Sequence, residues 1–415
     1  MIVKNMNQEN YLWIIGGGML QIPLIDEAKN LGLRTIVSDQ SEFCLCRELA
    51  DIFAPIDIFD TDAHIAFYDS NLAHQKLNIV GVLAAGIDAH ETMAYLAEHL
   101  GLPGVQPSIS TLVSNKDLFR EFMANNNFDI PRFEVITHDN LQQIEEIANR
   151  IKFPLIIKNT SSSGSRGTKI FYNPDFEEMK KIALTAIEVS RSKKALIESF
   201  WEGTEHTVET IFDINGDFHR CFITDRNFDK SNGYALETGL VHPSLLSAHL
   251  QEEMYLLAEN VSRAVGIKVG ASKFDMICTT TGPKIIEMTV RLSGGFDCQY
   301  LVPVATGKNI LGAAILTSLG KPISKNFLLD SKHKIALSES LWPKPGKISD
   351  IIGLEEAKKL PGFEHIFFRY GMNDIVEPFT DCTKRICFII ASGDSLSEAQ
   401  QNMSNIKNTI IIITS

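Results

Sequence analysis

Hydrophobic and polar positions alternate in two different ways along this chain. In the first hundred residues, short apolar runs at 11–15, 34–37 and 79–83 take turns with helix-like patterns such as 89–100. Strands that alternate with helices favour a parallel, doubly wound α/β sheet. This first unit is expected to end near 104–114, where Pro103, Pro107 and two glycines interrupt the pattern.

After residue 115, strands follow one another directly. Strand 154–158 enters the polar loop 159–167 and returns at 169–172, which predicts a hairpin, and strands 195–200 and 205–213 flank a short linker. The predicted fold class is therefore α/β, then α+β with mixed or antiparallel sheets. The expected units are 1–114, then 115–326 (divided into 115–195 and 196–326), then a C-terminal subdomain, 327–415.

Composition narrows the class of protein. The 415 residues are 44% hydrophobic and carry a net charge of −12, without a Lys/Arg cluster that would follow a nucleic-acid backbone. The seven cysteines are scattered, which favours neither a disulfide framework nor a zinc site. No apolar run approaches the roughly 20 residues that span a bilayer. A cytoplasmic protein with small-molecule ligands, and no nucleic-acid or membrane partner, is expected.

One predicted hairpin carries two acidic residues and an arginine. Alternation in its return strand puts Glu287, Thr289 and Arg291 on one face, with Ile286 on the other. If Asp275 lies across the ladder from Glu287, the two carboxylates repel unless a cation lies between them, and magnesium suits such oxygen ligands. An exposed charged face of a hairpin would have the same spacing.

Two further segments suit phosphate and adenine. The loop Asn159–Gly167 is rich in small residues, so its amides can approach an anion closely, and Lys158 precedes it. A plain hairpin tip would look the same. The linker Glu198–Glu205 can offer backbone groups to an adenine edge and a carboxylate to ribose hydroxyls.

The turn Gly16–Gly18 lies between a strand and a helix. Its spacing does not match G-x-G-x-x-G, because Gln21 stands where a third glycine is needed. Substrate or anion binding at the helix start, a plain tight turn, or a dehydrogenase that binds nicotinamide here are the three interpretations. We expect Gly17 and Gln21 to contribute to substrate specificity.

In their order along the chain, these segments resemble the ATP-grasp superfamily. The resemblance is to the branch that holds carbamoyl-phosphate synthase large-chain modules, biotin carboxylase and L-amino acid ligases, and it covers essentially the whole chain. It implies a pre-ATP-grasp sheet, an ATP-grasp domain and a C-terminal subdomain. It also implies ATP and magnesium as cofactors.

The resemblance implies a role for each matching residue. ATP would be bound by Lys116, Lys158, Ser161, Ser162, Ser163, Gly164, Ser165, Gly167, Glu198, Ser199, Phe200, Glu205, Phe274 and Ile286. The metal would be bound by Asp275, Glu287 and Thr289. Arg291 and Lys158 would be catalytic. The substrate would meet Glu237, Arg291, Ser293, Gly294, Gly295, Gly17 and Gln21.

Three positions depart from the family pattern, one of them Asp275, which stands where the family usually has glutamate at the first metal position. Thr289 replaces the usual asparagine of Glu-x-Asn-x-Arg, and its shorter side chain makes a second bound metal less favourable. Glu237 matches an acidic residue that could hold a substrate amine, but Leu240 stands where amino acid ligases have histidine.

The expected function is that of an ATP-dependent carboxylate–amine ligase that forms an amide through an acyl phosphate. A carboxylase or carbamoyl-phosphate-synthase-like enzyme that uses bicarbonate, and a weakened ATP-binding protein, are the alternatives. The expected partners are a small-molecule carboxylate and an amine, with a homodimer as the expected assembly.

Overall fold

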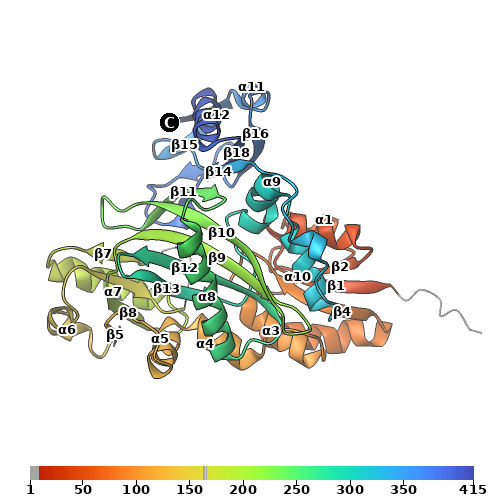
Figure 1. Cartoon of the computed structure of the whole chain (residues 1–415), viewed down its shortest axis with the longest axis horizontal. Coiled ribbons are helices and arrows are strands. Elements are labelled where there is room, and N and C mark those ends of the chain that lie inside the picture. Colours follow the sequence, from red (N-terminus) through yellow and green to blue (C-terminus); the bar gives the residue numbers. More distant parts are fainter. Residues whose placement is uncertain (1–8, 162–163, 165) are drawn as a thin grey trace, which may run out of the picture.

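A four-stranded parallel sheet, in the order β3-β2-β1-β4, forms the N-terminal unit of the computed structural model (Figure 1). The structure describes residues 9–161, 164 and 166–415. The strands are β1 (Asn10–Ile15), β2 (Arg34–Ser38), β3 (Ile52–Ala54) and β4 (Asn78–Ala84). Helices α2 (Thr61–Phe67) and α3 (His90–His99) cover one face, and α1 (Ile22–Asn30) packs on the other. The predicted doubly wound sheet is confirmed.

The segment expected to be an irregular boundary contains a helix. Helix α4 (Pro107–Ser114) begins at a proline and is followed by α5 (Lys116–Asn125). A proline at the first helical position has a suitable φ and lacks only an amide that would have no partner there. Pro107 therefore starts a helix instead of breaking one.

A small antiparallel sheet of four strands, in the order β5-β8-β6-β7, follows. Its strands are β5 (Phe133–Ile136), β6 (Leu155–Asn159), β7 (Lys169–Phe171) and β8 (Ala195–Ser199), and helices α6 (Ile144–Ile151) and α7 (Phe176–Val189) pack on it. Strands β6 and β7 pair as the predicted hairpin.

The largest sheet has eight strands in the order β13-β12-β9-β10-β11-β14-β18-β16. The first five are β9 (Thr204–Phe212), β10 (Phe218–Asp229), β11 (Leu236–His242), β12 (Gly270–Thr279) and β13 (Gly282–Thr289). The long helix α8 (Ala248–Val265) crosses this sheet (Figure 1) and buries its apolar side against β9, β12 and β13.

The C-terminal strands β14 (Ile335–Glu339), β16 (Phe363–Phe368) and β18 (Cys387–Gly393) extend the same sheet. A three-stranded sheet of β15 (Gly346–Ile352), β17 (Ile375–Val376) and β19 (Ile411–Thr414) lies beside it, with α11 (Leu354–Ala357) and α12 (Leu396–Thr409). The large sheet thus contains strands from both sides of residue 327, the expected boundary. The division into units stays a prediction.

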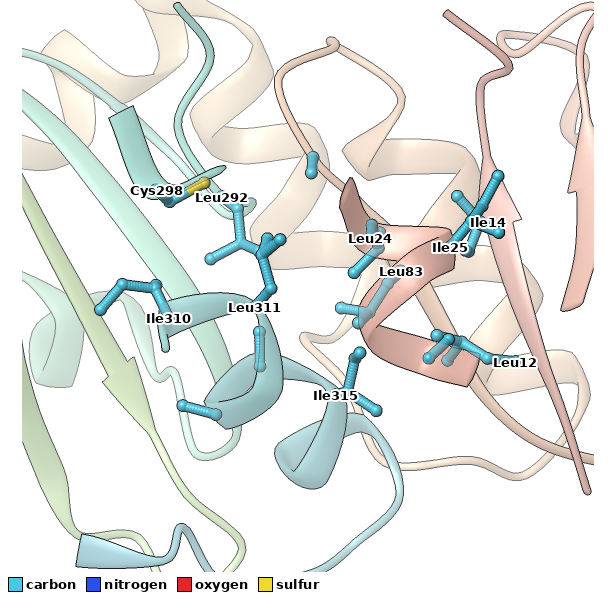
Figure 2. Packing of buried hydrophobic residues seen from close by; sticks show 14 of the residues in the cluster. Leu12, Ile14, Leu24, Ile25, Leu83, Leu292, Cys298, Ile310, Leu311 and Ile315 are labelled. Carbon is cyan, nitrogen blue, oxygen red and sulfur yellow. The ribbon is translucent and has the colours of Figure 1, made fainter. Parts of the chain in front are cut away.

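One apolar cluster joins the N-terminal sheet to the centre of the chain (Figure 2). Helices α9 (Val302–Thr306) and α10 (Ile310–Ser318) follow the large sheet, and α10 packs against α1 and β4. Figure 2 shows Leu311 and Ile315 beside Leu24 and Leu83, with Leu292 close by. The buried core therefore fixes the segment after Arg291 against the N-terminal unit.

Candidate active site

A cavity of about 690 Å³ lies where the N-terminal unit, the small sheet, the large sheet and the C-terminal segment meet. Gly18 lines it from the first unit, Lys158 from the small sheet, Asp275 from the large sheet and Arg385 from the C-terminal segment. Binding sites form preferentially at such junctions between units.

Most of the residues expected in the site line this one cavity. They are Gln21, Lys116, Lys158, Gly164, Glu198, Ser199, Phe200, Glu205, Glu237, Asp275, Ile286, Glu287, Arg291, Ser293, Gly294 and Gly295. Five described residues do not line it: Gly17, Ser161, Gly167, Phe274 and Thr289. Ser162, Ser163 and Ser165 lie outside the described residues.

The acidic hairpin has the expected register with one irregularity. Asp275 on β12 pairs with Glu287 on β13, but Met276 pairs with Ile285, so Ile286 is the extra residue of a β-bulge. Ile286 and Glu287 both line the cavity, while Ile285 points into the core. The prediction that Ile286 lies on the face opposite Glu287 is therefore wrong, because the bulge interrupts strict alternation.

Basic side chains surround the two carboxylates. The Oδ1 atom of Asp275 lies 2.5 Å from the Lys273 Nζ and 2.7 Å from the Arg226 Nη1. The Lys116 Nζ lies 3.2 Å from the Glu287 Oε2. Burial alone would raise the pKa of Glu287, but Lys116 and Lys273 lower it well below its usual range. Glu287 is therefore ready to act as an anion in a buried site.

Thr289 is two residue pairs further along, opposite Lys273. Its Oγ1 atom is buried and has no hydrogen-bond partner among the described residues. Phe274 faces the other way and packs in the core under α8. Neither side chain touches the cavity directly, so any contact of Phe274 with a nucleotide would be through its backbone.

A buried triad lines the cavity beside the small sheet. Glu198 accepts from the Arg120 Nε at 2.7 Å and lies 2.5 Å from the Lys158 Nζ. Burial would raise the pKa of Glu198, but the two cations hold it at about 2. Burial lowers the pKa of Lys158 and Glu198 opposes this. The Arg120 Nη2 also donates to the carbonyl of Ile286 at 2.6 Å, which holds the bulge.

The linker between β8 and β9 supplies an aromatic wall. Phe200 and Trp201 line the cavity, and the Phe200 ring contacts Tyr172 edge-on at 6.4 Å. Lys230 lies over the Phe200 ring at 5.3 Å and pairs with Glu205 at 2.6 Å. An apolar face with an adjacent carboxylate is the arrangement that was predicted for adenine and ribose.

The described part of the Gly/Ser loop is fixed at both ends. The Ser161 Oγ lies 3.0 Å from the Ser190 Oγ at the end of α7. A Cβ on Gly167, which has a φ of +62°, would lie 2.9 Å from the α7 backbone. Between them, the Gly164 carbonyl accepts from the amide of Cys382 at 3.1 Å. The loop thus contacts the C-terminal segment across the cavity.

Arg291 and the residues after it meet the N-terminal unit. The Arg291 Nη2 lies 3.1 Å from the Asp88 Oδ1. Gly294 and Gly86 approach so closely that a Cβ on Gly294 would lie 3.3 Å from the Gly86 Cα. Glycines permit this backbone contact. The amide of Ser293 donates to the buried Glu209 Oε2 at 2.6 Å, and the pKa of Glu209 is raised by burial to about 7.

The first glycine turn supports the site without lining all of it. The amide of Gly17 donates to the Asp39 Oδ2 at 2.9 Å, and the amide of Gly18 donates to the Gln21 Oε1 at 2.9 Å. The Gln21 Nε2 donates to the Ala85 carbonyl at 2.5 Å. Gln21 therefore links the turn to the end of β4, while Gly17 faces away from the cavity.

Glu237 is held between two arginines. Its Oε2 accepts from the Arg226 Nε at 2.8 Å and its Oε1 accepts from the Arg385 Nη2 at 2.9 Å. Burial would raise the pKa of Glu237, but the two arginines hold it at about 2. Both carboxylate oxygens already have partners, so this arrangement does not fit the expectation that Glu237 holds a substrate amine.

Sequence reasoning missed four cavity residues that balance charge: Arg120, Arg226, Lys273 and Arg385. Two of them had a signal. Arg120 is four residues after Lys116 on one helix, and Lys273 is two residues before Asp275 on one strand, so each shares a face with an expected residue. Arg226 and Arg385 reach the site only through tertiary packing.

The fold and this charged cavity define the class of protein. Residues 151–299 match the model of the ATP-grasp domain. Residues 340–415 match a second model, the L-amino acid ligase C-terminal domain 2. The chain therefore contains an ATP-grasp domain and is similar to ligases of the ATP-grasp superfamily.

Individual relatives narrow the comparison. Dapdiamide A synthase of Enterobacter agglomerans is 23% identical over 94% of this chain and 95% of that protein. Carnosine synthase 1 of Gallus gallus is 23% identical over 76% of this chain, and this covers 35% of that longer protein. A crystal structure of an L-amino acid ligase from Bacillus licheniformis has a TM-score of 0.82. It is 20% identical and covers 99% of this chain and 100% of its own.

Proposed function

We propose that this chain is an ATP-dependent carboxylate–amine ligase that joins two small molecules through an amide bond. One observation carries the proposal: a single cavity combines an aromatic-walled linker, the cations Lys116, Lys158 and Arg291, and a facing pair of carboxylates. The named relatives include a dapdiamide synthase and an L-amino acid ligase, which supports amide formation as the outcome.

The donor set fits magnesium. Asp275 and Glu287 are directly opposite each other, and both line the cavity. No group of three or more His, Cys, Asp or Glu side chains suited to a metal occurs within residues 9–161, 164 and 166–415. Magnesium needs only one or two carboxylates when phosphates and water complete its shell. Glu287, with Asp275 beside it, would hold the ion, which would neutralise phosphate charge when bound.

The chain's own side chains would do the rest of the work by position and charge. Lys116 and Lys158 would bind phosphoryl oxygens of ATP, and Arg291 would orient the substrate carboxylate towards the γ-phosphorus. The carboxylate oxygen bonds to phosphorus as the bond to ADP breaks, which gives an acyl phosphate. The amine then bonds to the acyl carbon, loses a proton, and inorganic phosphate leaves. No protein nucleophile is needed.

Isotope transfer tests this proposal. A substrate carboxylate labelled with ¹⁸O should place one ¹⁸O atom in the inorganic phosphate, because that oxygen bridges carbon and phosphorus in the acyl phosphate. Mass spectrometry of the phosphate measures it. Amide formation with unlabelled phosphate would contradict the mechanism, and ATP hydrolysis that needs only bicarbonate would favour a carboxylase.

The homodimer and the cytoplasmic location stay predictions. Among the described residues, every helix is too short or too polar to cross a bilayer.

A further inference from the structure

Six carboxylates line the cavity, and five of them have a basic partner. Glu198, Glu205, Glu237, Asp275 and Glu287 each lie within ion-pair distance of a lysine or arginine. Asp297 is the sixth. Its Oδ1 atom is buried and has no hydrogen-bond partner among the described residues, although the side chain is only 3% exposed.

Such a group is costly to leave alone. A buried carboxylate loses its hydration and regains stability only through a hydrogen bond or an opposite charge. Burial raises the pKa of Asp297 well above its usual range, and the charges of Glu237 and Glu209 raise it further. A cationic guest would relieve all of these effects together.

The fold holds Asp297 in place. The residue before it, Phe296, has a φ of +66°, which is unfavourable for a side chain of this size. Its ring stacks on Phe367 at 4.1 Å and meets Phe388 edge-on at 5.2 Å, both from the C-terminal strands. These contacts keep the Asp297 carboxylate at the cavity wall.

The position of Asp297 selects the kind of cation. Arg291, six residues earlier, lines the same cavity, as do Leu20, Ile87 and Leu240. A guest with an ammonium near a carboxylate, and with room for an apolar side chain, has the chemistry of an α-amino acid. We propose that Asp297 holds the ammonium group of an amino-acid substrate whose carboxylate lies at Arg291.

This inference rests on the proposed ligase function, because it assigns the substrate that the ligase activates. Asp297 takes the place of Glu237 as the expected receptor of the amine, because both carboxylate oxygens of Glu237 already bind arginines.

A binding experiment on the full chain tests the inference without turnover. The probes are the twenty proteinogenic L-amino acids, added singly with ADP and magnesium in a thermal-shift screen. Calorimetry then compares the strongest binder with the same acid lacking the amine. We expect the amine-free acid to bind at least about tenfold more weakly. Equal affinity of the two, or no binding by any amino acid, would overturn the inference.

Variants add a second readout. In Asp297→Asn, which keeps the shape but removes the charge, the amino acid should bind about as weakly as its amine-free counterpart, while ADP affinity is unchanged. Asp62→Asn, an exposed carboxylate on α2, is the matched control. If Asp297→Asn binds the amino acid like the wild type, Asp297 is not the receptor. Amide formation from amine-free acids would refute this inference alone, whereas amino-acid binding without any ADP release would refute the ligase proposal alone.

Discussion

At the scale of single residues, the site is a set of buried charges that compensate one another. Arg120, Lys158 and Glu198 form one group, and Arg226, Arg385 and Glu237 form another. Buried ion pairs add little stability overall, but removal of one partner leaves the other charge without compensation. The side chains that hold the site together are therefore also those whose loss should be most damaging.

Replacement of Arg120 by leucine should lower the free energy of unfolding by about 3 kcal/mol. The change removes the Nε donor of Glu198 and the Nη2 donor of the Ile286 carbonyl, both within the core of the site. Urea unfolding followed by circular dichroism measures the loss. Surface substitutions usually change the free energy of unfolding by no more than about 0.5 kcal/mol. A change as small as that in Arg120→Leu would show that Arg120 does not stabilise the site.

Glu209 should make stability depend on pH. Its folded pKa of about 7 lies above the ordinary value of 4.5, so between these values the folded state binds more protons than the unfolded state. The stability that this group gives is fully present below pH 4.5 and is lost as the pH rises through 7. Between pH 4.5 and pH 7, the free energy of unfolding of the wild type should fall by about 3 kcal/mol relative to that of Glu209→Gln. Parallel pH profiles for the two proteins would contradict the assignment.

At the scale of elements, the two hairpins and the linker between β8 and β9 form the part of the cavity that we propose binds the nucleotide. Gly203 in this linker lies against β12, where an added Cβ would be 2.2 Å from the Cys278 carbonyl oxygen. The linker therefore lies directly on the strand that carries Asp275. This close approach fixes the aromatic wall of the cavity relative to the acidic pair.

Substitution of Gly203 by alanine should move the linker away from β12. We expect a rise in the KM for ATP of about tenfold and a loss of about 1–3 kcal/mol in stability, because backbone atoms must shift. Gly371→Ala is the control, since its added Cβ would have only the Asp374 Oδ2 nearby, at 3.9 Å. Steady-state kinetics at saturating substrate provide the check, and an unchanged KM would show that the contact does not position ATP.

The sequence predicted elements better than it predicted their irregularities. The predicted hairpin allowed Asp275 to lie opposite Glu287, as it does, but strict alternation could not predict the bulge that turns Ile286 into the cavity. A proline can either interrupt a helix or begin one, and the local sequence alone does not decide between the two. Pro107 begins α4. Partners distant in sequence, such as Arg226 and Arg385, depend on tertiary packing and leave no local pattern.

At the scale of the whole molecule, the C-terminal segment completes the site. Its strands extend the large sheet, Arg385 reaches Glu237, and Phe367 and Phe388 pack on Phe296. The Cys382 amide also donates to the Gly164 carbonyl of the loop across the cavity. Residues 340–415 of this segment are those that match the L-amino acid ligase C-terminal domain 2.

Arg385→Ala should weaken substrate binding more than ATP binding. The change leaves Glu237 with Arg226 alone and opens the wall next to Phe388. We expect the KM for the carboxylate substrate to rise by about tenfold or more while the KM for ATP stays within about twofold. Steady-state kinetics for both substrates measure this, and an equal rise in the two KM values would place Arg385 elsewhere in the mechanism.

The central claim is that one cavity transfers phosphate from ATP to a carboxylate and then forms an amide. ADP release by the full chain, with ATP, magnesium and an amino-acid pool as source of carboxylate and amine, tests this most directly. ADP release should depend on the pool and fall by about 10²-fold or more in Glu287→Gln and in Arg291→Ala. ADP release that is the same without the pool, or unchanged in both variants, would contradict the claim.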